Sequence, residues 1–300
     1  MVVFKLDDQT KGALLVMCAG LSWGTMGLLG KIIYSTTNIG PISLALYRLF
    51  FAIPIFAALT IINGYDVSLT RREVVLFAAF GFCGLTVFEA LYFTSFAYTT
   101  VQHAAALLYT APAFVALLSW FILKEHLTRR KLVAVVLSVL GAFLVMGIVR
   151  GESLFASKTQ IGDWLALGSG LAYSSWYIFG KILGKNREPA VTSLIALSFG
   201  ALFLLPLTAG LEGIRVPNSL LAWGLLALVG LIPSTLAYLF YLGGLKLIDA
   251  TKASVFAIVE PLSAAVLAFV FFHEILSYDS LLGFILIISS ILLVSRHKDH

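Results

Sequence analysis

Long apolar stretches, separated by short polar or charged segments, dominate the pattern of the chain. A transmembrane helix needs about 20 mostly apolar residues. Ten stretches meet this requirement: residues 12–34, 41–62, 74–97, 101–123, 132–149, 161–181, 190–211, 220–244, 250–272 and 280–295. They are continuous and lack the alternation typical of a transmembrane β-barrel. The pattern therefore predicts an all-α integral membrane protein with ten transmembrane helices.

Composition narrows the class of protein further. Hydrophobic residues make up 60% of the chain and charged residues only 12%, and the mean hydropathy is +1.00. Because soluble domains carry about 25% charged residues, these values exclude a soluble enzyme, a disordered chain and a nucleic-acid-binding module. Cys18 and Cys83 lie inside apolar stretches and form neither a disulfide framework nor a metal-ligand pattern. The sequence has no Walker motif, and we expect no cofactor, metal or nucleic-acid partner.

The distribution of Lys and Arg predicts how the bundle is oriented. If the N-terminus is cytoplasmic, the cytoplasmic segments contain 15 of these residues and the outer segments contain four, Lys31, Arg150, Lys158 and Arg215. Arg48 lies inside the second span. Because cytoplasmic loops of membrane proteins are enriched in Lys and Arg, we expect both termini to be cytoplasmic. The same rule accounts for the net charge of +5 without a nucleic-acid partner.

The two halves of the chain, residues 1–150 and 151–300, resemble each other at a nearly fixed offset. Gly30-Lys31-Ile32 recurs 150 residues later as Gly180-Lys181-Ile182. At an offset of 149, the matched pairs include Gly81 and Gly230, Tyr92 and Tyr241, Ala104 and Ala253, Pro112 and Pro261, and Glu125 and Glu274. Since each half holds five spans, an odd number, the second half must enter the membrane with opposite polarity. Inverted repeats of this kind recur in transporters that expose a central cavity to each side alternately.

The repeated segments carry a family resemblance. Residues 90–128 and 236–276, together with Ser22-Trp23-Gly24 and Arg48, resemble the drug/metabolite transporter superfamily, ten-helix EamA type. The resemblance implies two EamA-like five-helix repeats in a plasma-membrane carrier for small metabolites, often an exporter of amino acids or related compounds. Glu89 and His103 are not features of the general family pattern. The substrate, the coupling ion and the choice between monomer and homodimer stay open.

Three charged residues inside predicted spans are candidates for a substrate or coupling site. Glu260 lies about ten residues into the ninth span, or about 15 Å deep at 1.5 Å per residue. Glu89 and Arg48 lie in the outer halves of the third and second spans, where they could form an ion pair. Charges inside a membrane are costly and often functional, although a buried structural pair would explain Glu89 and Arg48 equally well.

Two prolines are predicted to interrupt helices beside this site. Pro261 follows Glu260 directly and frees carbonyls one turn earlier, and Pro112 takes the matching position in the first half. A carboxylate next to free carbonyls suits an ammonium group or a proton. Because burial raises the proton affinity of a carboxylate, we expect Glu260 to couple protonation or amine binding to conformation.

Aromatic side chains supply the remaining candidates for the cavity wall. They are Trp23, Tyr92, Tyr109, Trp176, Tyr238 and Tyr241. For each residue taken singly, ordinary helix packing is the better explanation, but as a set they favour a cavity for an apolar or aromatic amino acid. Glu125 and Glu274 are expected to cap or pair locally at matched helix ends.

Other functions fit the sequence less well. An uptake carrier for a nucleotide or sugar derivative would need clustered intramembrane Lys or Arg, and only Arg48 is available. An intramembrane enzyme would need converging catalytic groups. Gly20-Leu21-Ser22-Trp23-Gly24 matches the G-x-S-x-G pattern, but it lies in a continuous apolar stretch without the strand–turn–helix context of a nucleophile. His103 is the only His predicted inside a span, and it is expected at the membrane interface, with a pH-sensing role as the less favoured alternative. The sequence therefore favours a secondary transporter with a small-molecule substrate and protons as a candidate coupling ion.

Overall fold

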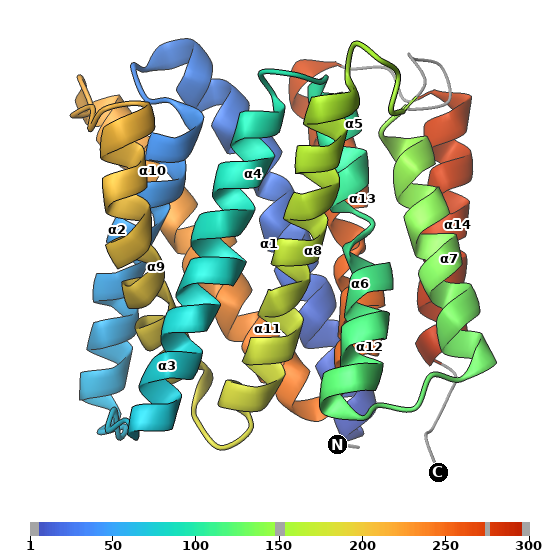
Figure 1. Cartoon of the computed structure of the whole chain (residues 1–300), viewed down its shortest axis with the longest axis horizontal. Coiled ribbons are helices and arrows are strands. Elements are labelled where there is room, and N and C mark those ends of the chain that lie inside the picture. The colour runs from blue at the N-terminus through green and yellow to red at the C-terminus, as the bar shows by residue number, and fades with distance from the viewer. Residues whose placement is uncertain (1–5, 148–153, 274–276, 296–300) are drawn as a thin grey trace, which may run out of the picture.

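The computed structural model describes residues 6–147, 154–273 and 277–295, which form a bundle of long helices and contain no strand (Figure 1). The first half comprises α1 (Asp8–Thr36), α2 (Pro41–Ile62), α3 (Arg71–Ala79), α4 (Phe88–Ser95), α5 (Val101–Leu108), α6 (Ala111–Leu118) and α7 (Arg129–Val145). The second comprises α8 (Gln160–Gly184), α9 (Pro189–Leu211), α10 (Leu220–Val229), α11 (Ala237–Leu247), α12 (Ala250–Ala257), α13 (Val259–Phe272) and α14 (Tyr278–Ser295). The π-helical segments are η1 (Phe80–Val87), η2 (Ser119–Leu123) and η4 (Gly230–Leu236).

Eight helical stretches of the described chain are long and apolar enough to cross a membrane. The two other long helices are α7, with 17 residues, and α8, with 25. The outward faces are apolar as well: Val136 on α7 is 56% exposed, Leu202 on α9 61% and Ile285 on α14 59%. A soluble protein would not expose so many large apolar side chains on every side. The expected all-α, multi-pass membrane protein is confirmed.

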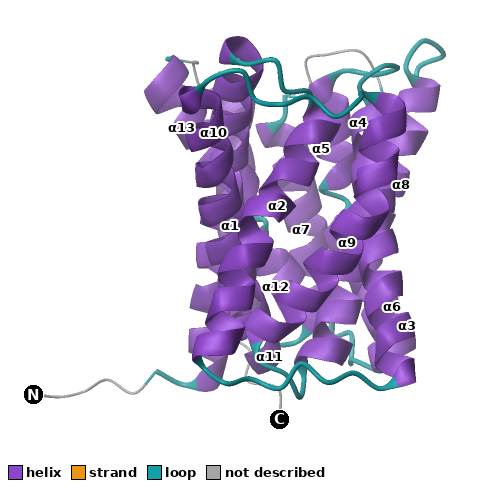
Figure 2. Ribbon diagram, turned by 90° about the vertical axis from the view of Figure 1, so that its left-hand side faces the viewer, coloured by secondary structure: helices purple, strands orange, loops and turns teal. Residues whose placement is uncertain are grey.

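The helices of the two halves pack mainly against each other. Helix α1 lies against α11 and α13, and α8 lies against α4, α5 and α6. Helix α2 packs on α9, and α7 packs on α14. The chain enters α1 and leaves α14 at the same end of the bundle, the lower end in Figures 1 and 2. The two halves therefore form one interlocked body with a shared centre.

A π-helical segment interrupts the third predicted span in each half, η1 in the first and η4 in the second. In η1, the hydroxyl of Thr86 donates to the carbonyl of Gly81, five residues earlier, at 3.2 Å. In η4, the hydroxyl of Thr235 donates to the carbonyl of Gly230 in the same way at 2.8 Å. In each segment the hydroxyl thus adds a side-chain hydrogen bond to a carbonyl five residues earlier, which is the backbone spacing of a π-helix.

The fourth predicted span of each half is broken near the middle of the bundle. Helix α5 ends at Leu108 and α6 resumes at Ala111, next to Pro112. Helix α12 ends at Ala257 and α13 resumes at Val259, two residues before Pro261. Since proline lacks an N–H group, it cannot bond the carbonyl four residues earlier. Those carbonyls belong to Leu108 and Ala257, which agrees with the predicted interruptions.

A glycine of the facing helix lies against each freed carbonyl. A Cβ atom on Gly20 of α1 would lie 2.8 Å from the oxygen of Ala257, and one on Gly170 of α8 would lie 3.1 Å from that of Leu108. Side chains larger than hydrogen would thus push α1 or α8 away from the broken helix. Gly184 near the end of α8, by contrast, has open space around it.

We predict that Gly20→Ala lowers the free energy of unfolding in detergent by about 1–3 kcal/mol, because the added methyl group has no room against Ala257. The matched control is Gly27→Ala on the same helix, where a Cβ atom would meet nothing within 4 Å. That change should be neutral or slightly stabilising, because alanine favours helix. Thermal unfolding of both variants checks this, and equal effects would contradict the close packing at the break.

Candidate functional site

A cavity of about 910 Å³ occupies the middle of the bundle. Tyr34 and Ser35 at the end of α1, Pro41 at the start of α2 and Val101 at the start of α5 line its outer part. These helix ends lie at the upper end of the bundle in Figure 1, opposite the end where α1 begins. The cavity therefore runs from the helix breaks to the upper face, and its size matches that of a small-molecule site.

Most of the residues that the sequence singled out lie together on the wall of this cavity. The lining includes Trp23, Arg48, Glu89, Tyr92, Tyr109, Trp176, Tyr238 and Glu260. Tyr241 does not line it: its ring is completely buried behind the wall, 5.4 Å from the ring of Trp23. Pro112 lines a small void of about 10 Å³ beneath Glu260, which has room for about one water. Pro261 is buried, and its effect on the site is the backbone N–H group that it lacks.

Glu260 lies where the two broken helices meet. It is in the first turn of α13, and the hydroxyl of Tyr109, from the break between α5 and α6, donates to its Oε1 at 3.2 Å. The carboxylate lines both the large cavity and the small void. Among the described residues, no cation lies within ion-pair distance of it. A side chain with this placement can bind a positively charged group or a proton that enters the cavity.

Arg48 and Glu89 form the ion pair that their predicted depths made possible. The Nη2 atom of Arg48 on α2 donates to Oε1 of Glu89 on α4, and both residues are more than nine-tenths buried. The Nε atom of Arg48 is buried and has no hydrogen-bond partner in the described part of the chain. Because the charges of the pair cancel, Glu260 keeps a net negative charge at the bottom of the cavity when it is ionised.

Aromatic rings form the wall around these charges. Trp176 stacks on Tyr238 with ring centroids 4.7 Å apart, and its indole N–H donates to the carbonyl of Gly84 at 2.6 Å. Trp23 lies 6.2 Å from Tyr238. The faces of such rings attract organic cations and pack well against flat apolar groups. The wall thus suits a ligand that combines an apolar body with a positive charge.

Several lining residues were missed in the sequence. Phe88 and Phe96 stand four residues before and after Tyr92 and contact its ring, at centroid distances of 5.9 and 4.9 Å. The spacing of four places all three on one face of a helix, a signal that could have identified them. Lys31, which the charge count assigned to an outer segment, lines the outer part of the cavity.

The remaining candidates lie outside the cavity. Glu125 does not pair locally but accepts a hydrogen bond from the backbone N–H of Ala250, in the other half, at 2.7 Å. His103, in the first turn of α5, is buried against α8, with its Nδ1 atom 3.2 Å from Oδ1 of Asp163 in the first turn of that helix. Glu274, the counterpart of Glu125, lies outside the described residues.

Comparison with known proteins places the chain among transporters. A family model described as the EamA-like transporter family matches twice, over residues 10–147 and 160–296. An uncharacterized transporter from Archaeoglobus fulgidus is 28% identical over 295 residues, which cover 97% of this chain and 99% of the relative. The uncharacterized inner membrane transporter YicL from Salmonella typhimurium is 27% identical over 298 residues, 97% of each chain.

A solved crystal structure shares the fold. It superposes with a TM-score of 0.81 over 95% of this chain and 96% of the other, at 19% sequence identity. At this identity the likeness describes the arrangement of the helices and says nothing about the ligand.

We predict that breaking the Arg48–Glu89 pair is costly. Glu89→Gln leaves the guanidinium buried without its counter-charge and should lower the free energy of unfolding by about 3–5 kcal/mol. The double variant Arg48→Gln/Glu89→Gln removes both charges, so it should lose clearly less than the sum of the single variants. Thermal unfolding of all four proteins measures the coupling, and strictly additive losses would show that the pair contributes nothing.

Proposed function

Since the chain belongs to the EamA-like transporter family, we propose that it is a secondary carrier that exports small metabolites across the plasma membrane by alternating access. Amino acids or related amines are the proposed substrates, and protons are the proposed coupling ion. The observation that carries this proposal is Glu260, the one carboxylate of the described cavity lining without a cationic partner, at the closed end of an aromatic cavity.

The proposed topology has ten crossings and two inverted repeats, residues 1–150 and 151–300. The double match of one family model supports the repeats, since its two starts lie 150 residues apart. The recurrence of a π-helical segment, a proline break and a facing glycine in each half gives further support. Because Lys and Arg are concentrated in the segments at the lower end of the bundle, we assign this end to the cytoplasm. The cavity then opens to the outside.

Glu260 is the proposed binding point for the ammonium group of the substrate or for a proton. A carboxylate at the closed end of the cavity cannot hold both, so an incoming proton would displace an amine toward the open face. If the proton and the amine compete for Glu260 at each face in turn, proton entry would be coupled to amine export. The Nε atom of Arg48, which has no partner among the described residues, is a donor for the carboxylate of an amino acid after a local side-chain rearrangement.

An uptake carrier for a nucleotide or sugar derivative is the alternative. A phosphate group is best held by several converging cations or free backbone amides. In the described part of the cavity the Lys and Arg residues are Lys31 and Arg48, and Arg48 is already neutralised by Glu89. These charges favour an amine over a phosphate.

A transport screen in proteoliposomes tests the proposal. The panel contains amino acids, aromatic primary amines and nucleotide derivatives, and each is assayed with and without a pH gradient. We expect transport of an amino acid or amine, increased by a gradient that drives protons in the opposite direction. Transport confined to nucleotide derivatives would favour the alternative, and transport that ignores the gradient would remove the proton from the mechanism.

We predict that Glu260→Gln abolishes the dependence of transport on pH and lowers its rate at least about tenfold, because the amide cannot exchange a proton or pair with an ammonium group. The matched control is Glu188→Gln, on an exposed loop, which should leave both properties unchanged. An unchanged rate and pH profile in Glu260→Gln would end the proposed role of this carboxylate.

A further inference from the structure

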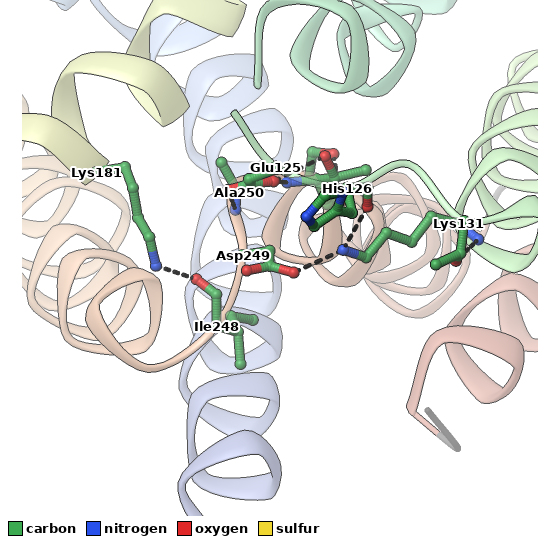
Figure 3. A network of polar contacts seen from close by, with 10 residues as sticks. Glu125, His126, Lys131, Lys181, Ile248, Asp249 and Ala250 are labelled. Atoms are coloured by element: carbon green, nitrogen blue, oxygen red, sulfur yellow. Dashed lines mark hydrogen bonds and ion pairs between the residues drawn. The ribbon is translucent and has the colours of Figure 1, made fainter. Parts of the chain in front are cut away.

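Polar contacts between the two halves hold the lower end of the bundle closed beneath the cavity (Figure 3). The Nζ atom of Lys131 on α7 donates to Oδ2 of Asp249 at 2.7 Å and to the carbonyl of His126 at 3.0 Å. Glu125 accepts from the backbone N–H of Ala250 at 2.7 Å and so caps the start of α12. The segment before α7 is thereby bound to the turn between α11 and α12.

Lys181 makes a further contact at this end, within the second half of the chain. It lies in the last turn of α8, and its Nζ atom donates to the carbonyls of Leu245 and Ile248, at 2.7 and 2.5 Å. The carbonyls at the end of α11 have no helical partner, so the ammonium group supplies one. This binds α8 to α11 at the lower end.

The sequence repeat places an equivalent set of groups at the upper end. Lys31 of α1 corresponds to Lys181 at an offset of 150, and Phe96 and Thr99 correspond to Leu245 and Ile248 at an offset of 149. Phe96 and Thr99 follow the end of α4, and among the described residues no hydrogen bond is made to their carbonyls. Lys31 and Phe96 both line the cavity. In this conformation the ammonium group of Lys31 lies over the ring of Phe272 on α13, 4.0 Å from its centroid.

We propose that Lys31 is the outer counterpart of Lys181 and that the two lysines take turns in closing the cavity. When the upper face closes, the ammonium group of Lys31 moves from Phe272 to the carbonyls of Phe96 and Thr99 and binds α1 to α4. When the lower face opens, Lys181 releases Leu245 and Ile248. The assignment rests on the proposed alternating-access function and gives each face of the carrier a named contact.

The two faces differ in one respect. The residues equivalent to Lys131 and Asp249 at an offset of 149 are Ser280 and Thr100, which cannot form an ion pair. The lower closure therefore has a charged contact that the upper closure lacks. This difference favours the conformation with the upper face open, which is the one the structure shows.

Thiol labelling of vesicles of known orientation tests the proposal without a substrate. Cys18 and Cys83 are replaced, and one reporter cysteine is placed at Ala264, on the cavity wall, or at Ser254, which is buried below Glu260. A membrane-impermeant maleimide should label Ala264→Cys from the upper face. It should reach Ser254→Cys from the lower face only when the lower end opens.

We expect Lys181→Met to raise labelling of Ser254→Cys from the lower face by about tenfold, because two hydrogen bonds from a charged donor are lost. Adding Lys31→Met should reverse most of this increase, since the upper closure then loses its contact as well. Lys131→Met should also raise the labelling, in a second test of the closed lower face. Lys185→Met, one turn beyond Lys181 and exposed, is the matched control and should have no effect.

Three results would overturn the proposal or its premise. If Lys181→Met raises the labelling and Lys31→Met does not reverse it, Lys31 is not the outer counterpart. If Lys31→Met by itself raises the labelling of Ser254→Cys from the lower face, Lys31 does not stabilise the closed upper face. If no variant exposes Ser254→Cys while Lys181→Arg and Lys181→Met both unfold at the wild-type temperature, alternating access itself fails, and with it the proposed function.

Discussion

The structure depends on two helix breaks that meet in the middle of a membrane bundle. Backbone carbonyls without partners are tolerated at that depth only where protein or a wet cavity surrounds them. Here α1 and α8 each present a glycine to the carbonyl that a proline has freed, so that the facing helix covers the break at close range. The same breaks carry Tyr109 and Glu260, whose hydrogen bond joins the two halves at the closed end of the cavity. The feature that weakens two helices therefore also forms the closed end of the cavity.

Charge in this centre is distributed unevenly. Arg48 and Glu89 neutralise each other in the wall, and aromatic rings take up much of the remaining surface. Glu260 is left as the one carboxylate of the described lining without a cationic partner. A positive ligand or a proton neutralises this charge, whereas a phosphate would be repelled by it. In the proposed carrier, competition between the ligand and a proton for Glu260 couples ligand binding to the movement of the helices.

Much of the fold could be predicted from the sequence, because lipid imposes simple rules on helix length and on charge. The predicted second span, residues 41–62, coincides with α2, and the gap between the predicted spans 74–97 and 101–123 falls between α4 and α5. The depth of Arg48 and Glu89 was sufficient to suggest their contact. Depth alone could not show which face of a helix a side chain occupies, so Tyr241 was placed in the cavity although it lies behind the wall. Nor could local pattern show that Glu125 caps a helix 125 residues away in the chain.

Distance measurements between spin labels report on whether the cavity opens to one face at a time. One pair, at Thr36 and Gln102, spans the upper mouth, and a second, at His126 and Lys246, spans the lower end. In wild-type protein we predict a major population with the upper pair far apart and the lower pair close. In a variant that lacks the lower contacts, the upper distance should shorten as the lower distance lengthens. Two distances that stay fixed, or that lengthen together, would contradict a cavity that opens to one face at a time.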